Sequence, residues 1–189
     1  MNKKPHLTEL LSLLDKPALK KWANQQGLKG IDITKESSKW MNAGTSIHSQ
    51  IENYIRKGEP FISDIDQSYF KCFIEDKEIL GLENNIETEW FKGRYDIKVK
   101  WKDKIYLMDF KNHSKRIYFE NKLQLIGYGM AEQCDCFAVV SVPSFTVMNF
   151  KVENRSPYEE ILKCLSKIYT LKQEIENPDI DIEVGCLRD

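Results

Sequence analysis

The sequence contains no long apolar run and no signal-peptide pattern, and from these absences we expect neither a membrane-spanning nor a secreted protein. No stretch approaches the roughly 20 consecutive apolar residues that a membrane-spanning helix needs. The first residues, 1–6, are not followed by the apolar segment of a signal peptide. We therefore expect an intracellular, cytoplasmic protein that does not contact a membrane.

Cysteines are few, odd in number and scattered, at positions 72, 134, 136, 164 and 186. They lack the paired spacing of a structural zinc site and the regular framework of a small disulfide-rich protein. Cys134 and Cys136 are the only close pair, and they precede an apolar run at 137–140. Because free cysteine is among the most buried residue types, packing in a core explains this pair more simply than metal binding does.

An excess of positive charge is also absent, since the net charge is −1 and the pI is near 6.3. Proteins that coat nucleic-acid backbones are usually basic, so the overall charge argues against a nucleic-acid partner. Local charge softens this objection, because lysines recur at every second position from 98 to 104. On a hairpin these lysines would share one face, although a solvated outer face explains them at least as well.

The chain has 189 residues, of which 41% are hydrophobic and 30% charged, and this is enough for one full core. It contains no internal repeat, low-complexity run or clear linker. We therefore expect a single domain over 1–189.

Hydrophobic periodicity predicts helices through the first sixty residues, beginning with apolar residues at helical spacing over 7–14. A second helix is expected from Pro17 to about Gly27, and a longer one from about 35 to 57. Gly44 either interrupts the longer helix or marks its true start. His48 and Glu52 lie four residues apart on this helix, so they share a face.

After a further helix over about 66–80, the apolar period changes from that of a helix to that of a strand. The second and third predicted strands form a hairpin, and Asp96 and Asp109 are expected to meet at its open end. This order of elements predicts an α/β fold with a mixed central sheet flanked by helices. The pattern places strands at 86–91, 95–101, 105–110, 137–142 and 145–152, and further helices at 119–133 and 157–176.

Three residues near this hairpin are of the types that phosphodiester hydrolysis requires: Asp96, Asp109 and Lys111. The reaction needs hard oxygen ligands for a divalent cation, a polarised water and positive charge near the phosphorus. Asp109 and Lys111 are two apart on a strand, so both project to one face. Such a pair alone is often only a surface ion pair, but the apolar run 105–108 marks a buried strand that delivers both charges to the sheet edge.

Four short motifs follow one another along the chain: Gly44-Thr45 with His48 and Glu52, Gly93 with Asp96, Asp109-Phe110-Lys111, and Gln124 with Tyr128. In this order they resemble the motifs of RecB-type nucleases of the PD-(D/E)XK superfamily, in particular the group similar to mitochondrial genome maintenance exonuclease and its phage and bacterial relatives. The resemblance implies a protein of bacterial or phage origin. The resemblance implies a restriction-endonuclease-like core over 82–176, an N-terminal helical cap with the histidine-bearing helix over 1–60, and a tail over 177–189.

The resemblance also implies a metal site and its ligands. His48, Asp96 and Asp109 would bind Mg²⁺ or Mn²⁺, and the backbone carbonyl of Phe110 would be a further ligand. Related nucleases that carry an iron–sulfur cluster hold it with four cysteines, one before the nuclease core and three after it. No cysteine precedes Cys72 and the later ones are not clustered in that way, so we expect no cluster.

The other motif residues receive roles in catalysis from the same resemblance. Lys111 would steady the attacking water or the phosphate, and Gln124 and Tyr128 would position this lysine or the nucleic-acid backbone. Glu52 and Glu87 match acidic positions of the group and rank second. Basic and aromatic residues that follow the active-site strand would contact the substrate, namely Lys115, Arg116, Tyr118 and Phe119.

The residues and the resemblance together predict a metal-dependent deoxyribonuclease. The resemblance further implies an exonuclease that acts on the ends of single-stranded DNA during repair, replication or recombination. An endonuclease of restriction or repair type on the same core is one alternative. A catalytically silent nucleic-acid-binding module is another, although the complete set of expected ligands argues against it.

Overall fold

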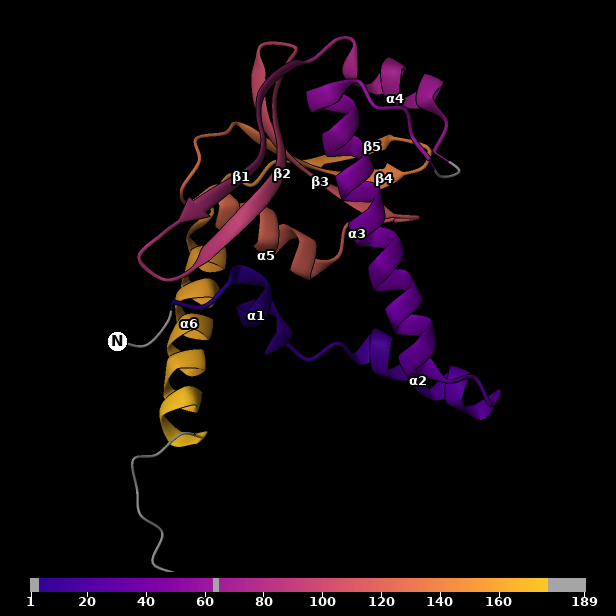
Figure 1. Cartoon of the computed structure of the whole chain (residues 1–189). Coiled ribbons are helices and arrows are strands. Elements are labelled where there is room, and N and C mark those ends of the chain that lie inside the picture. Colours follow the sequence, from indigo (N-terminus) through magenta and orange to yellow (C-terminus); the bar gives the residue numbers. More distant parts are fainter. Residues whose placement is uncertain (1–3, 63–64, 177–189) are drawn as a thin grey trace, which may run out of the picture.

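The computed structural model describes residues 4–62 and 65–176, and Figure 1 shows a central sheet with helices on both sides. The side chains of Ala18, Glu36 and residues 39–43 are outside this description. The helices are α1 (Leu7–Ser12), α2 (Pro17–Leu28), α3 (Ile33–Lys57), α4 (Gln67–Ile74), α5 (Phe119–Tyr128) and α6 (Ser156–Glu176). The strands are β1 (Glu78–Glu87), β2 (Lys92–Trp101), β3 (Lys104–Asn112), β4 (Cys136–Val142) and β5 (Thr146–Phe150).

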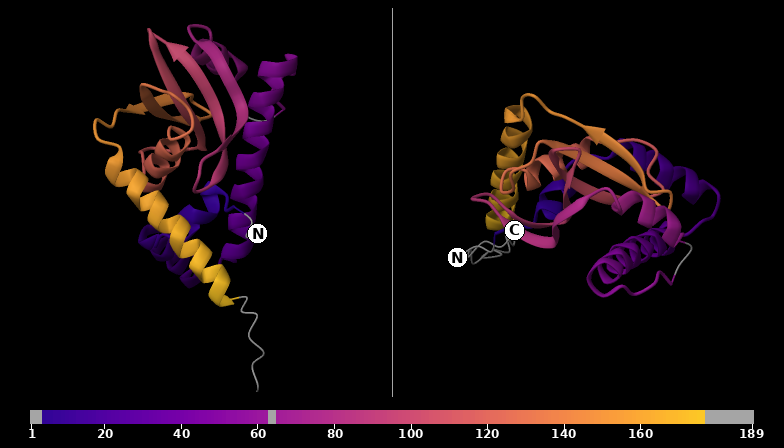
Figure 2. Two further views of the ribbon diagram at one scale, coloured as in Figure 1. Left: turned by 90° about the vertical axis from the view of Figure 1, so that its left-hand side faces the viewer. Right: turned by 90° about the horizontal axis from the view of Figure 1, so that it is seen from above.

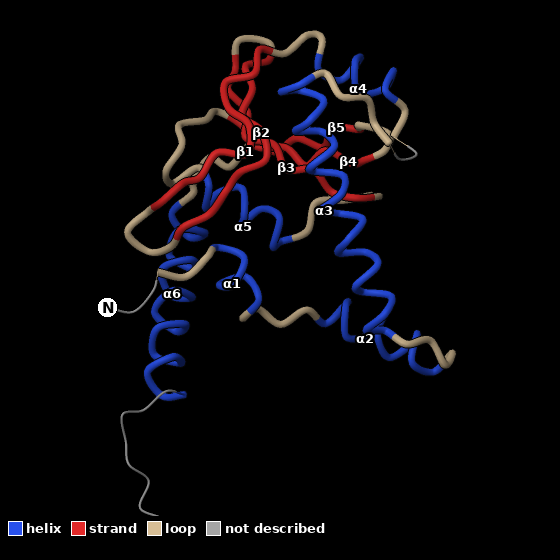
Figure 3. The backbone as a smooth tube through the Cα atoms, viewed as in Figure 1, coloured by secondary structure: helices blue, strands red, loops and turns tan. Residues whose placement is uncertain are grey.

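The five strands form one mixed sheet in the order β1-β2-β3-β4-β5. Only β3 and β4 are parallel, and α5 provides the crossover that a parallel pair requires (Figure 3). The tight turn between β2 and β3 has Lys102 and Asp103 at positive φ, which gives the twist that a two-residue hairpin loop favours. The α/β fold with a mixed sheet flanked by helices, as predicted from the sequence, is confirmed.

One face of the sheet is covered by α1, α5 and α6. These helices contribute Leu10, Ile126 and Leu162, all fully buried, to a core that includes Leu107 of β3 and Val139 of β4. Residues of β3 and β4 that alternate with these point the other way, because successive side chains of a strand face opposite sides. The side chains of the odd-numbered residues of β3 therefore point toward α5.

The opposite face is covered by α3 and α4. Ile51 of α3 and Phe70 of α4 pack with Met108 of β3 and Val140 of β4 in a second core. Burial on both faces explains why β3 and β4 have almost continuous apolar sequences. In Figure 2 the long helix α3 runs along the sheet and continues beyond it, toward α2.

The start of the sheet differs from the prediction. The expected helix over 66–80 ends at Ile74, and the first strand is β1 at 78–87 rather than 86–91. Residues 88–91 form a turn in which the Thr88 hydroxyl donates to the Phe91 carbonyl and accepts from the Trp90 and Phe91 amides. The strand predicted at 86–91 included the adjacent aromatic residues Trp90 and Phe91. Phe91 instead belongs to this turn, and its side chain is buried.

The break expected at Gly44 is also absent, since α3 is continuous from Ile33 to Lys57. Asp32 caps its first turn by accepting from the amides of Thr34 and Lys35, and Gly58, at φ 70°, ends it in the left-handed conformation that glycine tolerates. The tail expected at 177–189 lies outside the described residues. Among the helices described over 4–62 and 65–176, none combines the length and apolar character of a membrane span.

Candidate functional site

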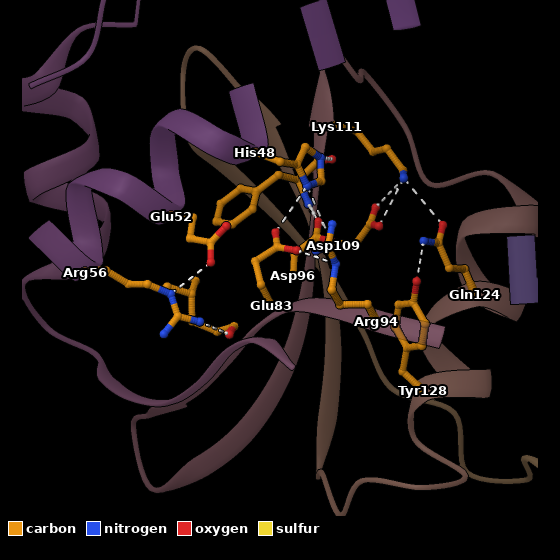
Figure 4. Close-up of polar contacts among 12 residues, drawn as sticks. His48, Glu52, Arg56, Glu83, Arg94, Asp96, Asp109, Lys111, Gln124 and Tyr128 are labelled. Carbon is orange, nitrogen blue, oxygen red and sulfur yellow. Dashed lines mark hydrogen bonds and ion pairs between the residues drawn. The ribbon is translucent and has the colours of Figure 1, made fainter. Parts of the chain in front are cut away.

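Three side chains from three elements form a group that could bind a metal ion: His48 of α3, Glu83 of β1 and Asp96 of β2 (Figure 4). One ligand atom of each lies within 4.8 Å of the others. His48 Nδ1 is 3.4 Å from Asp96 Oδ1 and 3.7 Å from Glu83 Oε1. An imidazole nitrogen with two carboxylates is a donor set suited to a divalent cation.

Asp96 owes its position to the end of the β2–β3 ladder. The last regular pair beside it is Ile97 with Met108, and beyond this point Asp96 Oδ2 accepts a hydrogen bond of 2.7 Å from the backbone N–H of Phe110. The side chain thus replaces a backbone partner. Its second oxygen, Oδ1, faces His48. Because the carboxylate is buried, these two partners are needed to stabilise its charge.

Glu83 reaches the group through an irregular conformation within β1. Leu82 pairs with Ile97 and Asn84 with Tyr95, so Glu83 lies opposite Asp96. Its φ of 50° is left-handed, which is uncommon for a residue with a side chain and costs about 1–3 kcal/mol. This conformation holds a nearly buried carboxylate, with only 7% of the side chain exposed, beside His48.

His48 is held on both sides of its ring. Nε2 lies 3.1 Å from the Phe110 carbonyl oxygen, which therefore faces the group. Burial by itself lowers the pKa of His48, but hydrogen bonds to Asp96 and Glu83 and the charge of Asp109 raise this pKa to about 10. At neutral pH, in the absence of a metal, His48 is therefore protonated and its positive charge lies beside the carboxylates of Asp96 and Glu83. A bound cation would supply that positive charge instead.

Asp109 and Lys111 form a second cluster beside the first. The Lys111 ammonium donates to Asp109 Oδ1 at 3.0 Å and lies 2.9 Å from Oδ2, which accepts no well-oriented hydrogen bond among the described residues. Burial raises the pKa of Asp109 to about 6 against the opposing charge of Lys111. Burial alone lowers the pKa of Lys111, but the charges of Asp109 and Asp96 raise it, so the ammonium stays charged at neutral pH.

Two residues of α5 extend this second cluster. Lys111 Nζ also donates to Gln124 Oε1, over a long 3.4 Å, and Gln124 Nε2 donates to the hydroxyl of Tyr128 at 2.9 Å. Burial raises the pKa of Tyr128, so this hydroxyl stays neutral. One helical turn separates Gln124 from Tyr128, so Gln124 contacts the lysine directly and links Tyr128 to it.

Neither of the two acidic residues ranked second in the sequence belongs to the metal group. Glu52 forms an ion pair with Arg56 at 2.9 Å, one turn further along α3. Glu87, at the far end of β1, is 67% exposed and pairs with Lys4. Glu83 stands where Glu87 was expected. The sequence signal that could have identified it is the alternation of Leu80, Leu82 and Ile86, which is typical of a strand.

A cavity of about 530 Å³ opens over the metal group. Side chains of α3, β1, β2 and α5 line it, together with the start of α1. The lining residues are His6, Thr8, Gly44, Thr45, His48, Ser49, Glu52, Glu83, Asn85, Arg94, Asp96, Gln124 and Tyr128.

The segment predicted to contact the substrate follows β3 directly. Lys115 and Tyr118 line a second hollow, of about 370 Å³, that also includes Lys111. The guanidinium of Arg116 lies 4.6 Å from the centre of the Tyr118 ring. Tyr118 and Phe119 are 44% and 48% exposed, so both rings are accessible.

The described cysteines are free thiols. Cys134 and Cys136 are buried, as the apolar context predicted, whereas Cys72 and Cys164 are exposed. Cys186 lies outside the described residues.

Comparison with known proteins yields distant structural likeness and no family. No protein-family model matches the chain, and no curated protein matches it. A solved structure titled "Crystal structure of SSO0001" is similar over 92% of this chain and 78% of that chain, with 12% sequence identity and a TM-score of 0.48. A likeness this distant carries no conclusion about function.

Proposed function

We propose that the protein is a divalent-metal-dependent deoxyribonuclease, and in particular an exonuclease that acts on single-stranded DNA ends. The observation that carries this proposal is the juxtaposition of two clusters at one end of the buried strand β3. The first offers cation ligands from His48, Glu83 and Asp96. The second holds a charged lysine, Lys111, against a buried carboxylate, Asp109.

The donor set fits Mg²⁺ or Mn²⁺, because two of its three ligands are carboxylates and the Phe110 carbonyl faces the same group. Asp109 is a further candidate ligand, since one of its buried oxygens accepts no well-oriented hydrogen bond among the described residues. A cation bound here would supply Lewis-acid polarisation of a phosphodiester oxygen and lower the pKa of a water.

Lys111 has the properties needed to stabilise the transition state. Its ammonium is partly exposed, with 34% of the side chain accessible, and its pKa is raised by neighbouring carboxylates. It can therefore donate to the phosphoryl oxygens on which negative charge develops. Gln124 and Tyr128 limit the directions that the lysine can take, so we assign them a positioning role.

Basic and aromatic residues beside the two clusters favour a nucleic-acid substrate. The hollow beside Lys111 is lined by Lys115 and by the exposed ring of Tyr118. Cations that follow the backbone and aromatic rings that stack on unpaired bases are the usual means of binding single strands. The preference for strand ends rests on the motif series from His48 to Tyr128.

The test uses end-labelled single-stranded DNA, double-stranded DNA, RNA and closed circular DNA, each with Mg²⁺, Mn²⁺ or EDTA. We expect short products from linear single strands with either metal and none in EDTA. Cutting of closed circles would instead indicate an endonuclease, and binding without turnover a silent module. Asp109→Asn and Lys111→Ala should each abolish cleavage, whereas Asp103→Asn, in the exposed turn between β2 and β3, should not. Full activity of either site variant would refute the site assignment.

A further inference from the structure

A cavity of about 670 Å³, distinct from the hollow beside Lys111, adjoins the cavity over the metal group. His6 and Thr8 line both cavities, so the two meet at the start of α1. Lys92, the first residue of β2, lines the second cavity, and Arg94 lines the first. A groove therefore leads from Asp96 along β2 toward its first residue.

The geometry of β2 sets the spacing of charges along this groove. Lys92, Arg94 and Asp96 are alternate residues of one strand, so their side chains lie on the same face. Alternate residues of a strand are roughly 7 Å apart. This step is comparable with the separation of neighbouring phosphates in an extended polynucleotide. Two cations therefore follow the metal group at intervals that match a nucleic-acid backbone.

The N-terminal segment is attached firmly enough to form one wall of the groove. The Lys92 amide donates to the Pro5 carbonyl at 3.0 Å, and His6 forms a parallel bridge with Lys92. His6 also caps α1, where its backbone amide donates to Glu9 and its Nδ1 lies 3.0 Å from the Thr8 hydroxyl.

The cations of the groove differ in how far they are already neutralised. Lys4 pairs with Glu87 and also donates to the Thr88 carbonyl at 2.8 Å. Arg94 pairs with Glu83 through Nε only, and 57% of its side chain is exposed. Lys92 makes no ion pair within residues 4–62 and 65–176. It lies opposite Glu87 in the β1–β2 ladder, but the Glu87 carboxylate pairs with Lys4, which lowers the pKa of Glu87 more than Lys92 does. Lys92 is therefore the cation best able to bind an incoming anion.

We propose that this groove is a subsite for the sugar-phosphate backbone of the substrate strand, with Lys92 contacting a phosphate two steps from the one at the metal group. This inference rests on the proposed function, because it takes the substrate to be a polynucleotide. It adds a contact that no motif of the sequence contains. Lys92 serves binding only and takes no part in the bond-breaking step.

The test measures binding of a fluorescein-labelled 12-residue oligothymidylate in EDTA, by fluorescence anisotropy, over a range of salt concentrations. Each phosphate contact in a single strand contributes about −0.7 to the slope of log K against log salt. Lys92→Gln should therefore flatten the slope by about 0.7 and weaken binding about fivefold at 0.1 M salt. Lys92→Arg, which keeps the charge, should retain the wild-type slope.

Lys100→Gln is the matched control, because Lys100 is an exposed lysine of the same strand that lines neither cavity. It should leave slope and affinity unchanged, and circular dichroism checks that each variant is folded. An unchanged slope in Lys92→Gln, or an equal loss in Lys100→Gln, would overturn the subsite. If wild-type protein still cleaves DNA with Mn²⁺, such a result removes only the subsite. Absence of both binding and cleavage in the wild type would remove the proposed function as well.

Discussion

Replacement of Glu83 by glutamine tests the metal group most directly, because it separates the candidate ligand that the structure adds from Glu87, the acidic residue of the same strand that the sequence ranked second. Glu83→Gln keeps the size of the side chain and removes its charge. Glu87→Gln makes the same chemical change on the same strand, at a residue that pairs with Lys4 outside the group.

The expected magnitude follows from distance and burial. Glu83 Oε1 is 3.7 Å from His48 Nδ1, and its side chain is 7% exposed. Unit charges at that separation attract by about 4 kcal/mol at an effective dielectric constant of about 20. We take this value as the scale of the attraction between Glu83 and a cation bound in the group, and desolvation offsets part of it. Since 1.4 kcal/mol corresponds to about a tenfold change in affinity, we expect the Glu83→Gln variant to bind Mn²⁺ about 100- to 1,000-fold more weakly than the wild type. Glu87 is 67% exposed, and its replacement should change the free energy of unfolding by about 0–1 kcal/mol and leave Mn²⁺ affinity unchanged.

Isothermal titration calorimetry with Mn²⁺ measures both affinities, and nuclease rates at subsaturating Mn²⁺ provide a second measure. The reasoning is refuted if Glu83→Gln binds Mn²⁺ as tightly as the wild type does. Equal losses in the two variants would show that a general loss of negative charge, rather than a ligand at Glu83, controls affinity.

Two further predictions concern His48 and Gly44. His48 has a folded pKa of about 10, above its ordinary 6.5, so its contribution to the stability of the metal-free protein is fully present below about pH 6.5 and is lost as pH rises through about 10. A cation must displace this proton, so Mn²⁺ affinity should rise about tenfold per pH unit between pH 6 and 8, and a flat profile would contradict the position of His48. Gly44→Ala should raise the free energy of unfolding by about 0.5–1 kcal/mol, because Gly44 lies within α3 and has open space where a Cβ would stand. Urea denaturation measures this change. A decrease in the free energy of unfolding would argue against a continuous helix at Gly44.

Local patterns in the sequence were sufficient for much of the fold. The hairpin of β2 and β3, the buried strand β4 and the amphipathic α6 all follow from apolar periodicity and turn residues, which depend on neighbours a few positions away. The prediction of a break at Gly44 was wrong, because a glycine only weakens a helix. The helix α3 is continuous between its capped ends at Asp32 and Gly58.

The candidate site divides in the same way between local and distant determinants. Motif spacing alone predicted that Lys111 would meet Asp109 two residues away, since alternate residues of a strand share a face. The resemblance to RecB-type nucleases pointed to His48 and Asp96, which come together only because α3 lies against the end of the sheet.

The sequence by itself determined the order of elements and the residue types available for chemistry. The tertiary structure alone decided which carboxylate joins His48 and Asp96. Glu83 enters the group through a left-handed backbone opposite Asp96, and Glu87 is directed to Lys4 instead. Both outcomes depend on the pairing of β1 with β2 and on contacts between residues far apart in the chain, which no local periodicity encodes.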